Sequence, residues 1–500
     1  MSRINTNVSS LIGQRILGQQ NGNLTKTLER LSTGLAINRG ADNPAGLIAS
    51  ENLRSEKAAI TAAIGNAERA DQVVNIAEGG LQEINSLLLE VQGLVGQSAN
   101  DAGLSRSERE ANQLQIDSIL GTIDRIAAQT SFQGTKLLNG TFDFTVSAQA
   151  SSVASFNINA AKLGYDEHRD VQLLVTQSAQ NAGLFLSFGG TALNFGGSTD
   201  NRFTLEIAGA LGSREFTFAS GTTNAAIADS INTFKSVTGI SAVASGNGLI
   251  LKSTEFGSAQ FVSVDIIDDG NQSGSILQLA STDNNAVSAS LSTAFSAVTN
   301  PVRDEGQDVG LIVNGIAAVS RGKFASIATD FLDLKVELTN SGAQNLQTID
   351  AFTITGGGAK FNLGPNVDIT NQVSIGISNV ASRKLGTSVN GFLDQLGSGK
   401  ANNVVDGDLT QAQKIVNDSI DMISSLRGRL GAFQKNVVGA TIRSLGVALE
   451  NTSAAESSIR DTDFASETAQ LTRSQILVNA ATNVLAIANS QPQAVLQLLG

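Results

Sequence analysis

The sequence contains no cysteine and no tryptophan, and it has only four prolines, two methionines, one tyrosine and one histidine among its 500 residues. Without cysteine the chain can form no disulfide, no thiolate metal site and no cysteine nucleophile. A single histidine, His168, leaves it almost without the usual general base and metal ligand. A chain free of cysteine also suits secretion in an unfolded state, because nothing can crosslink in transit.

The motifs of common catalytic sites are missing as well. A zinc protease needs two histidines four residues apart, and this chain has only one histidine. The glycine-rich segment 356–360 lacks the Gly-Lys-Ser/Thr of a phosphate-binding loop, so we expect a turn there. The segment 265–271 lacks the alternating Asp residues and closing Glu of an EF-hand, so we interpret it as an acidic turn. A Ser-His-Asp triad would have to use His168, which we expect on the surface, and there is no Gly-x-Ser-x-Gly motif. We expect no catalytic residues, no metal, no cofactor and no enzyme activity.

The charge is unevenly distributed along the chain. The net charge is −12; residues 1–140 carry 12 basic and 14 acidic groups, residues 401–500 carry 7 and 9, and the middle therefore carries −8. Near-neutral ends tolerate close packing against copies of themselves, an acidic middle suits a solvated surface, and neither favours nucleic acid. No apolar run resembles a signal peptide or a membrane span, which leaves a cytoplasmic protein or export by another route.

The residue pattern changes twice along the chain. Of the 21 phenylalanines, 18 fall within residues 141–400. The stretches 46–130 and 405–490 contain no proline, as long helices require. Apolar periodicity predicts helices over 5–35, 47–97, 107–129, 408–452 and 461–489, with Pro492 ending the last.

The middle alternates polar and apolar residues, the period of a β-strand, over 202–208, 215–218 and 260–266, and a short helix is expected over 224–237. The sequence therefore predicts a multidomain α+β fold, in which N- and C-terminal helices form a coiled coil and a helical-bundle rod around a β-rich central insertion.

The terminal helices are apolar on more than one face. Leucines recur along one face of the first helix, and the last has an apolar residue every seventh position, as in a coiled-coil seam (Leu24, Leu28, Leu31 and Leu35; Phe464, Leu471, Val478 and Leu485). Further apolar residues, including Ile12, Ile16, Ile476 and Ile487, lie on other faces. Such helices need more than one neighbour, so we expect them to become ordered when other copies cover them. An intramolecular helical bundle is the alternative.

Several segments resemble the ends of bacterial flagellins, in order and at both termini: Ile4–Val8, Leu28–Asn38, Ala41–Ala49, Glu78–Asn85 and Gln129–Leu138, then Glu456–Phe464, Gln475–Leu477 and Gln491–Leu499. Residues 201–266 resemble the flagellin hook-region insert. Gly500 departs from the family, where a basic last residue is common, and we expect little effect.

The resemblance implies a structural subunit that polymerises into the flagellar filament and a division of the chain into five segments. These are 1–45 and 456–500 as two halves of an inner coiled-coil domain, 46–145 and 396–455 as two parts of a helical rod domain, and 146–395 as a β-rich outer region. We expect self-assembly to use Ile4, Val8, Leu11, Leu24, Leu28, Leu31, Leu35, Phe464, Leu471, Val478, Leu485, Val495 and Leu498. A hook–filament junction protein, which has related termini, is the alternative.

The resemblance also implies partners and a location. The subunit would be exported unfolded by the flagellar type III apparatus and held beforehand by an export chaperone on about 461–499. It would then add under a filament cap to an extracellular filament attached through hook–filament junction proteins. The filament could contain this chain alone or sister flagellins too, and neither nucleic acid nor membrane is an expected partner.

One family motif is altered in this chain. Flagellins sensed by the innate immune Toll-like receptor carry Gln-Arg-Val-Arg-Glu-Leu, and the matching positions here are Leu89, Glu90, Val91, Gln92, Gly93 and Leu94. Glu90 reverses the charge of a key arginine, and Gly93 weakens the helix by about 1 kcal/mol. We expect weak or absent receptor activation.

Overall fold

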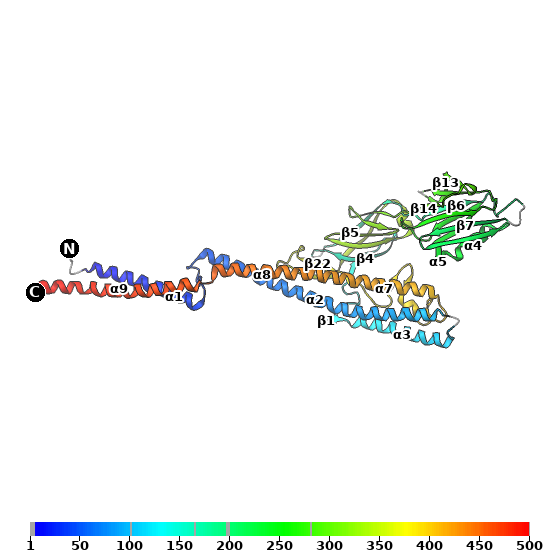
Figure 1. The fold of residues 1–500 in the computed structure, drawn as a ribbon. Helices are drawn as coiled ribbons and strands as arrows, with labels where there is room; N and C mark the ends of the chain where they lie inside the picture. Colours follow the sequence, from blue (N-terminus) through cyan, green and yellow to red (C-terminus); the bar gives the residue numbers. More distant parts are fainter. Residues whose placement is uncertain (1–5, 101–102, 165–166, 197–200, 281–282, 500) are drawn as a thin grey trace. The chain divides into compact units, whose positions relative to one another are not determined.

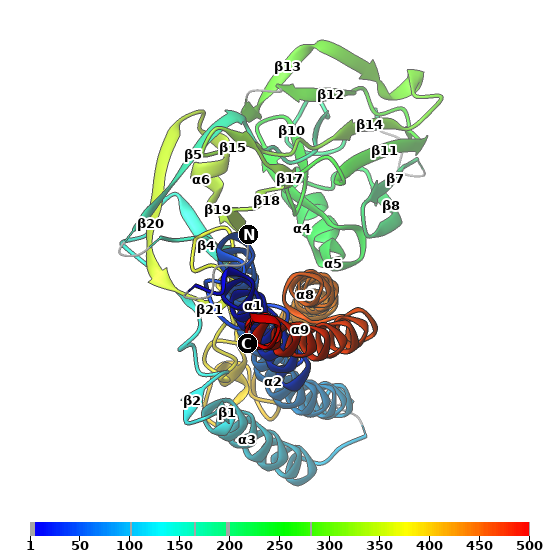
Figure 2. The same cartoon turned by 90° about the vertical axis from the view of Figure 1, so that its left-hand side faces the viewer.

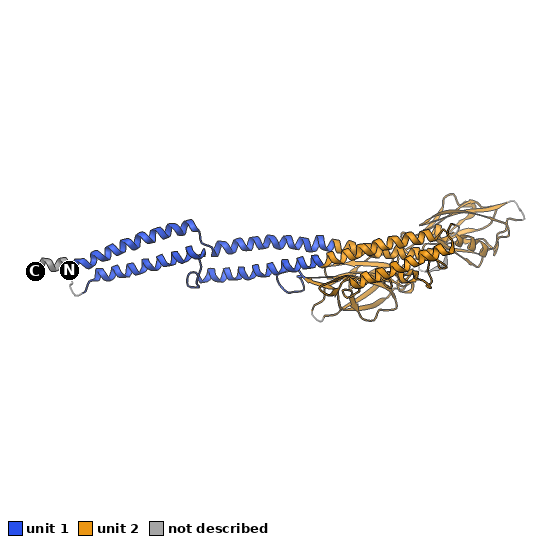
Figure 3. Ribbon diagram, turned by 90° about the horizontal axis from the view of Figure 1, so that it is seen from below, with its two compact units in different colours: residues 1–72, 362–371, 432–500 blue, residues 73–361, 372–431 orange. Residues whose placement is uncertain are grey.

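The computed structural model describes residues 6–100, 103–164, 167–196, 201–280 and 283–499 (Figure 1). The chain divides into two compact units (Figure 3). Within the described residues, unit 1 comprises 6–72, 362–371 and 432–499, and unit 2 comprises 73–361 and 372–431.

Unit 1 contains the helices of both chain ends. Helix α1, Val8–Thr33, starts where the Asn7 side chain accepts a hydrogen bond from the backbone N–H of Ser10, and it ends at Gly34, whose φ of 74° suits glycine. Helix α2, Pro44–Ser98, has proline as its first residue, where the missing N–H costs nothing. Its first part, up to residue 72, belongs to unit 1.

Helix α9, Phe464–Leu499, is longer than the sequence predicts. The prediction that Pro492 ends this helix is wrong, because the helix continues for seven more residues to Leu499. A proline inside a helix removes one hydrogen bond and crowds the preceding turn, which can bend the helix without ending it.

The helix predicted over 408–452 is present but contains a π-helical turn. It comprises α7, Leu409–Ala432, the π turn η3, Phe433–Val438, and α8, Gly439–Arg460. Phe433 and Val438 are five residues apart and both buried, which the wider π turn allows because its hydrogen bonds join residues five apart. Apolar periodicity does not reveal such a turn.

The helical part of unit 2 contains the second half of α2, α3 (Arg106–Gln129) and α7. Helix α3 begins with a capping box, in which Ser105 and Glu108 satisfy each other's backbone N–H groups. Arg427 on α7 pairs with Glu78 on α2 at 2.8 Å. Apolar residues of all three helices are buried, among them Leu81, Ile84, Leu88, Ile116, Ile123, Ile415 and Leu430.

The β-rich part of unit 2 has two modules, each with its own core and two antiparallel sheets. In the first module one sheet has the order β16-β15-β5-β20-β3 (Ile316–Ala317, Gly310–Val313, Arg169–Gln177, Thr348–Gly357, Phe144–Val146). The other sheet has the order β17-β18-β19-β4 (Val319–Arg321, Phe324–Ala328, Leu332–Leu338, Val153–Ala161), and the short helix α6 spans Asn340–Gln344.

The second module is inserted into the first between β5 and β15. Its sheets have the orders β13-β12-β6-β10-β9 (Asp283–Ala294, Ser275–Ala280, Gly183–Ser187, Gly248–Ser253, Ile240–Ser245) and β14-β11-β7-β8 (Val302–Glu305, Phe261–Asp268, Arg202–Gly209, Gly212–Ala219). The helix expected over 224–237 is present as α4 and α5 (Asn224–Thr233, Lys235–Thr238).

Phenylalanine fills the core of the second module. The rings of Phe188 and Phe295 lie with their centroids 5.5 Å and 5.2 Å from that of Phe203, which is fully buried. These contacts exist within one chain, so the module has a complete core of its own.

Short elements complete the fold: β1 and β2 (Ser131–Phe132, Thr135–Lys136), β21 and β22 (Ala359–Asn362, Gln372–Ile375), β23 and β24 (Gly386–Thr387, Gly391–Phe392), and η1 and η2 (Phe295–Ala297, Leu393–Leu396).

Candidate self-assembly surface

The two chain ends meet in an antiparallel helix pair. The Ser10 hydroxyl donates a hydrogen bond of 2.6 Å to the Asn489 side chain, and the Asn7 amide donates one of 2.7 Å to the backbone oxygen of Ala488. Farther along the same pair, Arg30 lies 3.9 Å from Glu467. Figures 1 and 2 show α1 and α9 side by side.

The residues between α1 and α9 follow a heptad spacing of alternating three and four. On α1 the buried or half-buried positions at this spacing are Ser10, Gly13, Leu17, Gln20, Leu24, Thr27 and Leu31. On α9, from Leu471 onward, they are Leu471, Ser474, Val478, Ala481, Leu485 and Ala488. This spacing is that of a coiled coil, and we call these thirteen residues the seam.

Small residues bring the two helices of the seam close together. A Cβ added at Gly13 would lie 3.1 Å from Cδ1 of Leu485, which is tighter than an ordinary contact. Ser474, Ala481 and Ala488 alternate with the larger seam residues of α9 and are all buried. The seam thus lets the helices approach closely, while large apolar side chains outside it stay uncovered.

Away from the seam, both helices expose large apolar side chains. On α1 these are Val8, Leu11, Ile12, Ile16 and Leu28, and on α9 they are Phe464, Ile476, Leu477, Val484 and Ile487. Leu11 and Ile476 are 58% and 62% exposed. We call these ten residues the exposed apolar faces. Soluble monomers rarely leave so many large apolar side chains in water, which makes these faces a candidate interaction surface.

The residues predicted for self-assembly fall into four groups. Five lie in the seam (Leu24, Leu31, Leu471, Val478, Leu485), and four lie on the exposed apolar faces (Val8, Leu11, Leu28, Phe464). Leu35 is half-buried beyond the end of α1, where its backbone forms an isolated antiparallel β-bridge with Asp461. Ile4 lies outside the described residues, and so do the side chains of Val495 and Leu498.

The leucine periodicity places two of these residues differently from the structure. The leucine spacing groups Leu28 with Leu24 and Leu31, yet Leu28 is 47% exposed, and Thr27 takes the buried position of the heptad. Phe464 continues the seven-residue series of α9 but is exposed at the first residue of the helix. The small and polar seam residues escaped the prediction because they carry little hydrophobic signal; the three-four spacing through Thr27 and Ala481 could have identified them.

Polar contacts connect the chain ends next to the seam. The backbone N–H of Ala36 donates to the oxygen of Arg460 at 2.7 Å, and that of Thr462 donates to Gly34 at 2.9 Å. Lys26 pairs with Asp42 at 2.9 Å, and this hydrogen bond, together with others from the backbone, holds the pKa of Asp42 below its usual value.

The predicted receptor positions lie on α2 beside a groove in unit 2. Leu89, Glu90 and Gly93 are exposed, whereas Val91 and Leu94 are buried. Gln92 is half-buried and donates a hydrogen bond of 2.7 Å to Asn417.

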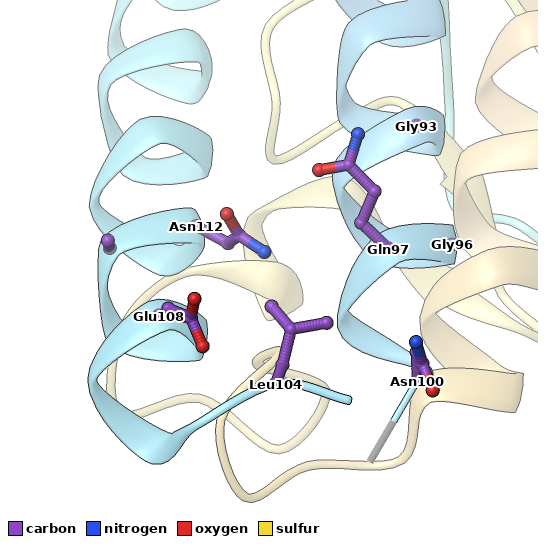
Figure 4. Close-up of a pocket in the computed structure, with 8 residues that line it drawn as sticks. Gly93, Gly96, Gln97, Asn100, Leu104, Glu108 and Asn112 are labelled. Atoms are coloured by element: carbon purple, nitrogen blue, oxygen red, sulfur yellow. The ribbon is translucent and has the colours of Figure 1, made fainter. Parts of the chain in front are cut away.

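The groove itself lies between α2 and α3 and has a volume of about 710 Å³. Figure 4 shows Gly93, Gly96 and Gln97 on α2, and Asn100 just beyond its end, facing Leu104, Glu108 and Asn112. A Cβ added at Gly93 or Gly96 would meet no atom within 4 Å. These two glycines therefore leave part of the α2 side of the groove without side chains.

The residues considered above as candidates for catalysis or ion binding are exposed or hydrogen-bonded within their own turn. His168 is exposed, as predicted. Asp268 and Asp269 accept hydrogen bonds from the backbone of Gly270 and Asn271, as the carboxylates of a tight turn do. Over the described ranges, no cluster of three His, Cys, Asp or Glu side chains could hold a metal ion. In the same part of the chain, no helix combines the length and apolar content needed to cross a membrane.

Three family models match the chain. The bacterial flagellin N-terminal helical region matches residues 4–143, the bacterial flagellin C-terminal helical region matches 413–499, and the flagellin hook IN motif matches 203–255. Together these segments include more than half of the chain.

Similar proteins extend over nearly the full length. A flagellin of Salmonella choleraesuis is 28% identical over 517 residues, covering 99% of both chains, and one of Clostridium tyrobutyricum is 27% identical over 491 residues, covering 98% of this chain and 100% of its own. Among solved structures, FliC of Burkholderia pseudomallei is 16% identical over 73% of this chain and 99% of its own, with a TM-score of 0.22. A TM-score this low does not establish a shared arrangement of the whole chains.

Proposed function

This chain belongs to the bacterial flagellin family and is a structural subunit of the flagellar filament, and from that premise we propose that the exposed apolar faces of α1 and α9 are the surfaces through which its copies assemble. The main support for this proposal is that ten large apolar side chains of the helix pair remain exposed in the single chain. Burying one such side chain is worth about 1.5–3 kcal/mol. A few of them covered by neighbouring copies would therefore stabilise a polymer strongly.

The same proposal gives each segment of the chain a place in the filament. Residues 1–45 and 456–500 form the inner coiled-coil domain, 46–145 and 396–455 form the helical rod domain, and 146–395 form the outer region. Near-neutral ends and an acidic middle support this division, because close packing of many copies disfavours like charge. Under this proposal Ile4, Val495 and Leu498 take part in assembly with the residues of the exposed apolar faces.

Deleting either end tests the assembly proposal. We expect variants lacking residues 1–35 or 465–500 to remain soluble and folded in unit 2, and to form no filaments when seeded with filament fragments. The full chain should elongate such seeds into long filaments. A short product that stops growing would instead favour the hook–filament junction protein, and seeded growth of either truncated chain would contradict the proposal.

Export and capture follow from the same family membership. We propose that the subunit leaves the cell unfolded through the flagellar type III apparatus and that a chaperone holds residues 461–499 before export. It would then join an extracellular filament beneath a cap and above junction proteins, alone or with sister flagellins. The lack of cysteine supports export of an unfolded chain. Flagellins are a structural protein family, and we propose no catalytic role for this one.

The altered receptor motif supports a separate proposal, that this flagellin activates the Toll-like receptor weakly or not at all. Glu90 is exposed where the motif has an arginine, Gln92 stands where it has the second arginine, and Gly93 presents a bare backbone where it has a glutamate. A reporter assay should show low potency that rises when Glu90→Arg and Gly93→Glu are combined. Potency of the unaltered chain equal to that of an enteric flagellin would refute this.

A further inference from the structure

A lysine, a side-chain amide and a buried carboxylate meet at one end of the first β module. Lys323, in the turn before β18, donates a hydrogen bond from Nζ to Oδ1 of Asn340, the first residue of α6, at 2.9 Å. Oε1 of Glu337, on β19, lies 3.8 Å from the same Nζ. We infer that Lys323 and Asn340 become joined by an amide bond between their side chains, formed by the chain itself with Glu337 as the proton carrier.

The surroundings of the lysine suit it as a nucleophile. Its side chain is 17% exposed, and its Nζ lies 5.6 Å from the centre of the Phe256 ring, so an aromatic wall covers one side of the amine. A lysine acts as a nucleophile when it is partly removed from water and next to a group that takes its proton.

Glu337 is placed to take that proton. It is 5% exposed, and its Oε2 accepts a hydrogen bond of 2.9 Å from the Ser155 hydroxyl, which leaves Oε1 directed to Lys323. A small side-chain rotation would bring Oε1 from 3.8 Å to the 2.6–3.2 Å at which a proton passes between heavy atoms. An isolated pair of charges is disfavoured in such a buried place, which favours the exchange.

The reaction balances without any oxidant or cofactor. The Lys323 ammonium gives one proton to Glu337, and the free amine attacks the amide carbon of Asn340. The bond from that carbon to the amide nitrogen then breaks, while Glu337 returns the proton to the departing nitrogen. Ammonia leaves and takes up the second proton of the attacking amine in water. Asn340 is exposed, so the ammonia has a path to solvent.

The backbone already holds the two side chains together. The N–H of Leu338 donates to the oxygen of Lys323 at 3.1 Å, and β18 pairs with β19 throughout, with Phe324 opposite Glu337. Bond formation therefore requires little movement, which is the main condition for a fast intramolecular reaction. The bond would tie the start of α6 to the β17–β18 turn.

Mass spectrometry of the purified full chain tests the inference. The intact mass should be lower than the sequence mass by one ammonia. After trypsin, Lys323 should remain uncleaved, and the peptides 322–335 and 336–360 should stay joined although the bond after Lys335 is cut. Glu337→Gln and Lys323→Arg should each have the full mass of its own sequence, with no ammonia lost. Trypsin should release peptide 336–360 from both variants.

Lys162 provides the matched control, because its Nζ contacts both oxygens of Asp330, a carboxylate that is 88% exposed. Lys162→Arg should leave the crosslink unchanged. Circular dichroism of each variant verifies that it is folded. A folded chain with cleavage after Lys323 and a free peptide 336–360 would overturn the inference. Loss of ammonia at another asparagine would do the same, because the two peptides would then separate.

Discussion

The terminal helix pair and the inserted β module use their apolar residues in opposite ways. In the module, Phe203, Leu205 and Ile207 alternate along β7 and are fully buried among residues of the same chain. In the helix pair, small residues occupy much of the seam, and Leu11 and Ile476 face solvent. The module is thus a complete core, and under the assembly proposal the helix pair is one part of a core that other copies complete.

This difference has a physical origin in the number of neighbours. Each strand of the module lies in a sheet that covers another sheet, so one face of the strand finds all its contacts within the chain. A pair of helices covers only one stripe on each partner, whatever its composition. Apolar residues beyond that stripe stabilise nothing until another surface arrives.

The largest expected effect comes from breaking the core of the module. Phe203→Ala removes a fully buried ring that contacts Phe188 and Phe295, and it should lower the stability of the module by about 3–5 kcal/mol. Chemical denaturation followed by circular dichroism measures this.

The control is Phe324→Ala in the first module, since Phe324, on β18, is 55% exposed. This substitution should change stability by no more than about 0.5 kcal/mol. If the two alanine variants lost equal stability, the module would not have the closed core described above.

An intermediate effect is expected on assembly from the exposed apolar faces. Ile476→Ser should leave the monomer within about 0.5 kcal/mol of the original chain, because the side chain is 62% exposed. In the filament it should cost about 1.5–3 kcal/mol of contact free energy. That loss raises the concentration needed for seeded growth by about tenfold or more.

Ile476→Leu serves as the control, since it keeps an apolar side chain of equal size and should polymerise nearly normally. A serine variant that assembles at the original concentration would show that this face does not contact other copies.

The smallest effect is a pH dependence in the part of unit 2 between β14 and β15. Burial tends to raise the pKa of Asp308, but hydrogen bonds from the Ser258 hydroxyl and from the N–H groups of Gly322 and Ser258 outweigh it, so the pKa is lower than usual. A carboxyl whose pKa is depressed on folding stabilises the fold above its unfolded pKa, and this contribution disappears as the pH falls through its folded pKa.

Unfolding measured between pH 5 and pH 2 should therefore show a decline below about pH 4 that is shallower in Asp308→Asn. An equal slope in the two proteins would mean that Asp308 contributes nothing. At neutral pH the variant should be slightly less stable, since an amide accepts the same hydrogen bonds more weakly.

The sequence predicts which segments form helices and strands better than it predicts the contacts between them. The helices over 107–129 and 224–237 and the strand at 202–208 appear nearly as predicted, because each has a strong period and clear end signals such as Ser105. The π turn at Phe433 is not predicted because no sequence period distinguishes it from an α-helix. Helix α9 continues past Pro492 because the loss of one hydrogen bond does not end a long helix.

The candidate surface was predictable only in part. Large apolar residues such as Leu471 and Val478 indicate a seam. Gly13 and Ala481 are equally part of it, but they contribute little to the hydrophobic periodicity. Which face of a helix stays uncovered depends on the partner helix, and that partner lies more than 400 residues away in the chain. Hydrophobic periodicity alone could not assign Leu28 and Phe464 to the exposed side.

Amide hydrogen exchange on the same protein as dilute monomer and as filament tests most directly whether the helix pair needs other copies. We expect the amides of α1 and α9 to exchange rapidly in the monomer and slowly in the filament, while those of β7 and β11 stay protected in both. Slow exchange of α1 and α9 in the dilute monomer, equal to that in the filament, would contradict the account.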